Sequence, residues 1–84
     1  MMIIKILGPG CANCRRLEKL TRASLDAAGV EASLCKVTDA ATYIDYGVMA
    51  TPGLVINEQT VCSGRVPSPS ELSKFIAAAQ ATSG

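Results

Sequence analysis

Hydrophobic and polar positions change their spacing several times along the chain, and each change marks an expected element. Residues 2–7 form a nearly continuous apolar run that ends at Gly8-Pro9-Gly10, which is typical of a central strand buried on both faces. After residue 14 the apolar positions recur at helical spacing as far as Gly29, a residue suited to the left-handed turn that follows a helix. The expected apolar face of this helix comprises Leu17, Leu20, Ser24, Ala27 and Ala28, opposite a polar face of Arg15, Arg16, Glu18, Lys19, Arg22 and Asp26.

The middle of the chain predicts a second strand and a short helix. Residues 30–37 regain strand character, and together with the first strand and the intervening helix they make a parallel βαβ unit. Either Thr38 or Asp39 is suited to cap a helix that runs to Tyr46, where Gly47 ends it.

The last third predicts a β-hairpin and a final helix. Residues 54–56 and 60–62 are short apolar strands joined by Asn57-Glu58-Gln59. Residues 68–71 read Ser-Pro-Ser-Glu, with a serine cap, proline at the first helical position and glutamate two residues later. The expected fold is therefore α/β, in the order β-α-β-α-β-β-α, with a four-stranded mixed sheet between helices. The apolar face of the last helix comprises Leu72, Phe75, Ile76 and Ala79.

Composition limits the domain count and the class of partner. The chain has 84 residues, of which 49% are hydrophobic and 18% charged, so a single packed domain over residues 1–84 is expected. The net charge is +1 and acidic and basic residues are interspersed, so no basic stripe is available for phosphates or anionic lipid. Nucleic acid and membranes are therefore not expected partners.

The four cysteines bear on the compartment. The apolar run of residues 2–7 is interrupted by Lys5 and is too short for a signal peptide core or a membrane span. We therefore expect a cytoplasmic protein, and in a reducing compartment a C-x-x-C pair indicates redox or metal chemistry rather than a structural disulfide framework.

The Cys11-Ala-Asn-Cys14 motif lies between an expected strand and an expected helix. Cys11 is thereby placed at a helix N-terminus, where free N–H groups and the helix dipole favour a thiolate, with a pKa lowered from about 8.5 to roughly 3.5–7.5. Cys14 follows one turn later, within bridging distance for a redox-active Cys11–Cys14 disulfide. The spacing predicts Cys11 as the nucleophile and Cys14 as the resolving thiol. Arg15 and Arg16 either favour the thiolate further or are simply solvated.

At these residues the chain resembles the thioredoxin and glutaredoxin superfamily, and more closely its small "redox-active disulfide" members, over nearly its whole length. Members carry a C-x-x-C after the first strand and a Thr-Pro with a cis peptide bond before the third, and Cys11/Cys14 and Thr51-Pro52 stand in that order. The resemblance implies a thioredoxin-like fold whose sheet has the second strand at one edge, followed by the first, third and fourth. It also implies that Pro52 faces the disulfide and that Thr51 presents backbone groups to a substrate chain.

The chain also departs from that pattern. It has no Trp before the motif, and the first strand supplies only Lys5 where thioredoxin carries a buried acid, so proton transfer at Cys14 must use water or another group. Glutaredoxins follow their fourth strand with Gly-Gly and an acid that bind glutathione, whereas here Gly64 is followed by Arg65. The sequence therefore gives no sign of glutathione specificity.

These features predict an enzyme, a thiol–disulfide oxidoreductase that reduces substrate disulfides through a mixed disulfide. The expected partners are a disulfide-bearing protein or small molecule and, as electron donor, a reductase or glutathione. We expect a monomer with no cofactor and no metal. The alternative is a Cu(I)- or Zn-binding carrier that uses the same two thiols on a ferredoxin-like fold. The expected helix over residues 38–47 and the Thr51-Pro52 turn do not match that fold.

The other two cysteines, Cys35 and Cys62, are expected to be small buried apolar groups. The resemblance places their strands at opposite edges of the sheet, three spacings or roughly 14 Å apart. That is beyond the roughly 7 Å between Cα atoms that a disulfide allows, so the two should not bridge each other.

Overall fold

Seven elements follow one another in the order expected from the sequence in the computed structural model, which describes residues 2–10 and 12–83 and, for 81–83, the backbone alone. The hairpin turn is two residues long rather than three, and the second strand begins at Ala32 rather than at residue 30. The elements are β1 (Met2–Leu7), α1 (Ala12–Ala28), β2 (Ala32–Val37), α2 (Ala40–Asp45), β3 (Gly53–Ile56), β4 (Gln59–Ser63) and α3 (Pro69–Ser83).

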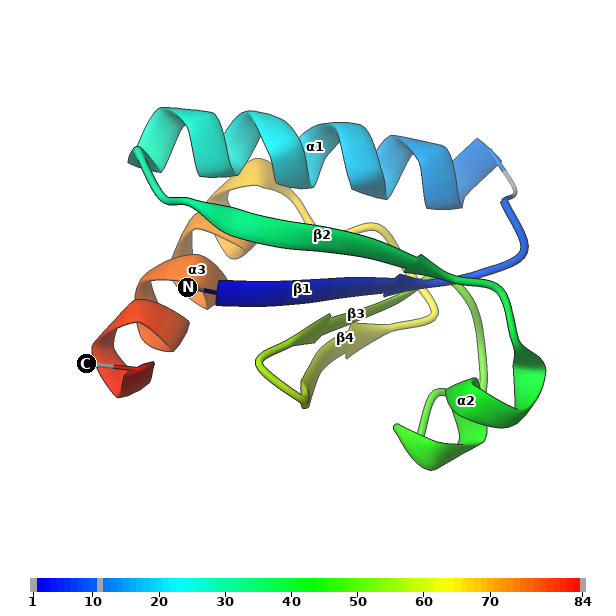
Figure 1. The fold of residues 1–84 in the computed structure, drawn as a ribbon. Coiled ribbons are helices and arrows are strands. Elements are labelled where there is room, and N and C mark those ends of the chain that lie inside the picture. Colours follow the sequence, from blue (N-terminus) through cyan, green and yellow to red (C-terminus); the bar gives the residue numbers. More distant parts are fainter. Residues whose placement is uncertain (1, 11, 84) are drawn as a thin grey trace.

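The four strands form one mixed sheet in the order β2-β1-β3-β4, as expected. β1 is parallel to β2 and antiparallel to β3, and β3 is antiparallel to β4. α1 and α3 cover one face of the sheet, and α2 lies on the opposite side at one end (Figure 1). That end also holds the β1–α1 loop and the segment between α2 and β3, so both predicted functional motifs lie there.

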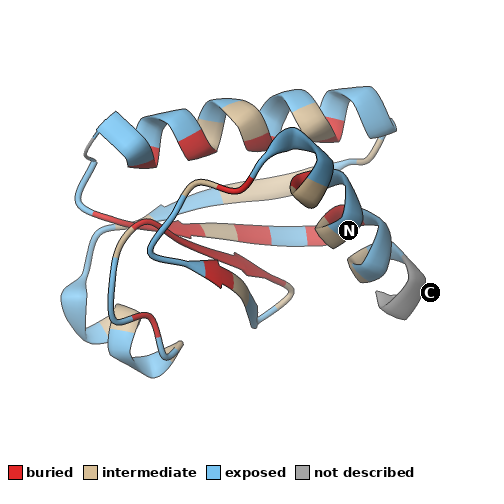
Figure 2. Ribbon diagram, turned by 180° about the vertical axis from the view of Figure 1, so that it is seen from behind, coloured by how far each residue is buried: buried red, intermediate tan, exposed pale blue. Residues whose placement is uncertain are grey.

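The main core fills the space between the sheet and the helices α1 and α3. On α1 the buried stripe is rotated from the predicted one, because Ala27 and Ala28 are exposed (Figure 2). The predicted apolar face of α3 is confirmed by burial of Leu72 and Ile76. The buried residues of α1 are Cys14, Leu17, Thr21 and Leu25, and the Thr21 hydroxyl is satisfied by the Leu17 carbonyl at 2.7 Å.

Among the described residues, the cover on the second face of the sheet comes from α2 and the segment that follows it. A small cluster of Leu7, Val48 and Val55 is buried there, while Ile3, further along β1 on the same face, is 43% exposed. Cys35 pairs in register with Lys5 and therefore lies on this uncovered stretch of an edge strand. The expectation that Cys35 is buried is wrong for that reason, whereas Cys62 is buried in the main core as expected.

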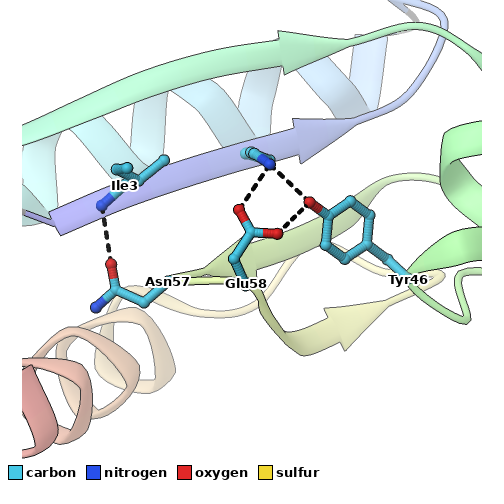
Figure 3. A network of polar contacts seen from close by, with 5 residues as sticks. Ile3, Tyr46, Asn57 and Glu58 are labelled. Atoms are coloured by element: carbon cyan, nitrogen blue, oxygen red, sulfur yellow. Dashed lines mark hydrogen bonds and ion pairs between the residues drawn. The ribbon is translucent and has the colours of Figure 1, made fainter.

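A polar network connects the β3–β4 turn to β1 and to the end of α2 (Figure 3). The Lys5 ammonium donates to the Tyr46 hydroxyl at 2.6 Å and to the Glu58 carboxylate at 2.8 Å, and the Tyr46 hydroxyl donates to the other Glu58 oxygen. Glu58 and its neighbour Asn57 have φ of +69° and +49°, conformations usual for the primed turns of two-residue hairpins. The hydrogen bond from Lys5 holds the pKa of Glu58 below its ordinary value.

The charge of Glu58 is expected to stabilise the fold in a pH-dependent way. Because the folded pKa is depressed, the contribution is present above the unfolded value of about 4.3 and is lost as pH falls through the folded value. Glu58→Gln keeps the side-chain length and the turn backbone but removes the charge. We expect the variant to have a lower Tm than the parent at neutral pH, with the difference vanishing in strong acid. Thermal unfolding followed by circular dichroism across this range measures it, and a Tm difference independent of pH would contradict the interpretation.

Candidate redox site

The turn between β1 and α1 brings the C-x-x-C motif to the end of the sheet. The chain leaves β1 at Leu7, passes through Gly10 with a φ of +87° that favours glycine, and starts α1 at Ala12. The predicted nucleophile, Cys11, lies outside the described residues. Cys14, the predicted resolving thiol, lies in the first turn of α1 and is 5% exposed, on the side that faces the sheet.

The lack of a side chain at Gly8 leaves room for the Cys14 sulfur. A β-carbon built on Gly8 would collide with the Cys14 Sγ and would lie 3.4 Å from its Cβ. Any larger residue at position 8 must therefore displace the sulfur or the backbone beside it. The same β-carbon would lie 3.8 Å from the Cβ of Thr51, so Gly8 is flanked by Cys14 and Thr51.

The Thr51-Pro52 segment also lies next to Gly8. The peptide bond between the two residues is cis, the isomer that the sequence predicts. Pro52 is fully buried, and its carbonyl accepts a hydrogen bond from the Gly64 N–H at 3.0 Å. Residues more than thirty positions apart in the sequence, Cys14 and Thr51, are thus brought together around Gly8.

A small cavity of about 40 Å³ lies beside Cys14. Its wall includes Gly8, Cys14, Glu18 and Lys36. Glu18 accepts from the Lys36 ammonium at 2.9 Å and from Arg22 at 3.3 Å, and its side chain is only 18% exposed. The Lys36 contact, followed by that of Arg22, holds the pKa of Glu18 below its ordinary value.

Reasoning from the sequence missed two features of this site. The sequence pattern indicates Gly8 only as the end of a strand, and it places Glu18 on the solvated face of α1. The spacing of Cys14 and Glu18 does carry the relevant signal, since side chains four residues apart on a helix lie on the same face. The approach of Gly8 to Cys14 could not be read from spacing, because it depends on how α1 crosses the end of β1.

The described part of the chain forms neither a cluster of metal-binding side chains nor a membrane-spanning helix. Among those residues, no three His, Cys, Asp or Glu side chains are grouped as they would be to hold a metal ion. The helices described there are all too short or too polar to span a membrane.

Comparison with known proteins identifies the family. Residues 2–77 match the family model described as the thioredoxin domain. The chain belongs to the thioredoxin family. A protein named thioredoxin from Methanothermobacter thermautotrophicus is 37% identical over 76 residues, which cover 90% of this chain and 99% of that protein. A thioredoxin from Methanocaldococcus jannaschii is 31% identical over 72 residues, covering 86% of this chain and 83% of the relative.

A solved structure agrees on the fold. A mutant thioredoxin from Halobacterium salinarum superposes with a TM-score of 0.68 and 21% identity, covering 92% of this chain and 73% of that one. The resemblance on which the sequence prediction rested is thereby confirmed, as is the thioredoxin-like fold. At the level of the family, this thioredoxin-like chain is a redox protein of the thiol–disulfide oxidoreductase class.

Proposed function

We propose that this thioredoxin-family protein reduces disulfide bonds in protein or small-molecule substrates, with Cys11 as nucleophile and Cys14 as resolving thiol. The observation that carries the proposal is the burial of Cys14 between Gly8 and Glu18, in the first turn of the helix that Cys11 directly precedes in the sequence. A buried second thiol is suited to resolve a mixed disulfide from within, because burial shields it from direct attack on substrates.

The first step is attack by Cys11. Its thiolate bonds to one sulfur of the substrate disulfide, and the other substrate sulfur leaves as a thiolate. Free N–H groups and the dipole at the start of α1 favour the Cys11 thiolate at neutral pH.

The second step is resolution by Cys14. Its thiol loses a proton and bonds to the Cys11 sulfur, and the second substrate sulfur leaves with the electron pair of the mixed disulfide. The substrate gains two electrons, and the protein is left with a Cys11–Cys14 disulfide. A reductase, or two molecules of glutathione that leave as glutathione disulfide, then returns the pair to the reduced form.

Thr51 and Pro52 form the substrate-binding part of the proposal. Thr51 lies beside Gly8 and close to Cys14, so a chain whose sulfur reaches Cys11 passes next to it. Backbone pairing between Thr51 and an extended substrate segment would hold that segment without demanding a particular side chain. We propose that the protein acts as a monomer in the cytoplasm and needs no cofactor.

The proposal is tested by catalysed reduction of insulin with dithiothreitol as the electron source. The protein should accelerate precipitation of the insulin B chain, and Cys11→Ser should return the rate to the uncatalysed one. A parallel titration with Cu(I) and Zn²⁺ addresses the carrier alternative. Tight stoichiometric binding of either metal without any catalysis would overturn the proposal in favour of the carrier.

A further inference from the structure

The buried Cys14 thiol needs a proton acceptor during resolution, and β1 does not supply one. A thiol must lose its proton to act as a nucleophile, and burial away from water disfavours the thiolate. Lys5, the ionisable residue of β1, lies on the opposite face of the sheet in the network with Tyr46 and Glu58. The proton of Cys14 therefore needs an acceptor on the α1 side.

The cavity beside Cys14 supplies one carboxylate among the described residues, that of Glu18. Cys14 and Glu18 are four residues apart on α1, so they share one face of the helix, and both line this cavity. Lys36 reaches the same place from β2, where its register partner Ile6 faces α1. The cavity volume of about 40 Å³ is enough for a water molecule between polar groups.

We propose that Glu18 accepts the proton of Cys14 through a water in this cavity during resolution of the mixed disulfide, and that Lys36 tunes its strength as an acceptor. The inference rests on the proposed function and deepens it, because it names the proton path that the second step requires. The proton passes from the Cys14 thiol through the water to the Glu18 carboxylate. The Cys14 sulfur bonds to the Cys11 sulfur, the substrate sulfur leaves as a thiolate, and Glu18 returns the proton to solvent.

The positive charges around Glu18 affect both its ionisation and its strength as a proton acceptor. Lys36 from β2 and Arg22 from α1 contact the two carboxylate oxygens, and Arg15 lines the same cavity. Lys36 and Arg22 hold the pKa of Glu18 below its ordinary value, so it is ionised and ready to accept a proton at neutral pH, but they also make it a weak base. Removing the contact from Lys36 should therefore strengthen Glu18 as an acceptor, whereas removing the carboxylate should abolish the path.

The test separates attack from resolution with Ellman's disulfide, 5,5′-dithiobis(2-nitrobenzoate), as the probe. All proteins carry Cys35→Ser, because the exposed Cys35 would also react. Attack by Cys11 releases one coloured thiolate and leaves a mixed disulfide, and resolution by Cys14 releases the second. Stopped-flow absorbance thus records two phases with one rate each. A parent protein that released its second thiolate no faster than its Cys14→Ser variant would defeat the proposed function itself, whatever Glu18 does.

Glu18→Gln should slow the second phase by about a hundredfold at neutral pH, the lower end of the range for loss of a general base. The first phase should stay within about twofold, because the helix N-terminus that activates Cys11 is intact. The deficit should close as pH rises above about 8.5, where solvent base deprotonates thiols directly.

Lys36→Gln is the matched variant, because it breaks the same ion pair as Glu18→Gln. It should speed the second phase, because Glu18 without this contact is a stronger proton acceptor, although both variants lose the same ion pair. Glu71→Gln removes a carboxylate of α3 that forms an ion pair with Arg65. It should change neither phase. Equal slowing by Glu18→Gln and Lys36→Gln would show a structural role for the pair and overturn the proposal. An unchanged second phase in Glu18→Gln would overturn it too.

Discussion

Cys14→Ser is expected to accumulate a covalent complex with its substrate while losing turnover by about a hundredfold or more, because the step that releases the substrate is gone. The variant keeps Cys11 at the start of α1, so attack on a disulfide proceeds and the mixed disulfide has no internal thiol to resolve it. Ser is close to Cys in size, and the 5%-exposed site beside Gly8 should accept it without rearrangement. Non-reducing electrophoresis after incubation with insulin, followed by mass spectrometry of the adduct, detects the complex.

Cys11→Ser is the matched control for this trapping experiment. Only the buried Cys14 is left in the motif, and a buried thiol is a poor target and a poor nucleophile. No adduct should form at the motif, and catalysis should be lost. Both variants should carry Cys35→Ser, so that the exposed Cys35 adds no adduct of its own. If the two variants trapped insulin equally well, the assigned roles of Cys11 and Cys14 would be wrong.

Gly8→Ala is expected to impair both the stability of the fold and the resolving step. The new methyl group would overlap the Cys14 Sγ and would also lie against the Cβ atoms of Cys14 and Thr51. Overpacking of this kind destabilises by about 1–3 kcal/mol. Because the atom displaced is the resolving sulfur itself, the release of the second thiolate from Ellman's disulfide should also slow. Urea unfolding gives the free energy, and the stopped-flow assay gives the rate.

Gly29→Ala separates these two effects. Gly29 lies at the opposite end of α1 with a φ of +66° and open space around its α-carbon, so alanine there costs about 1–2 kcal/mol through the backbone alone. Its stability should fall as in Gly8→Ala, but its redox kinetics should match the parent. Equal kinetics in both glycine variants would contradict the role assigned to Gly8.

Much of the fold could be predicted because local signals and tertiary requirements agree. The Asp39 cap, the Gly47 stop and the Ser68-Pro69 helix start appear in the structure where the sequence placed them. Their physics is local, since each satisfies backbone groups within a few residues. The C-x-x-C motif was found from its place between a strand and a helix and Thr51-Pro52 from the family resemblance, and the structure brings Cys14 and Thr51 together.

The errors have a shared physical cause. The exposure of Cys35 and the rotated buried stripe of α1 depend on which part of each sheet face is covered, and helical spacing alone does not determine it. A face chosen through Ala27 and Ala28 fits the periodicity, but the face through Cys14 and Leu25 is the one that packs on the sheet. The cavity beside Cys14 is lined by residues of both α1 and β2. Its contact with Lys36 could not be predicted from the sequence, because it depends on how these two elements pack together.

The central claim is that Cys11 and Cys14 interconvert between dithiol and disulfide, and a redox titration tests it most directly. Trypsin cleaves after Lys5 and Arg15, so one peptide, residues 6–15, contains both cysteines of the motif and neither of the others. The protein is equilibrated in glutathione buffers of stepped potential, quenched in acid, alkylated and digested. We predict that this peptide passes from doubly alkylated to unalkylated and internally bridged in one two-electron transition, with a tenfold change in ratio per about 30 mV. A peptide that stays doubly alkylated across the whole range, or that carries glutathione on one cysteine without ever forming the bridge, would contradict the account.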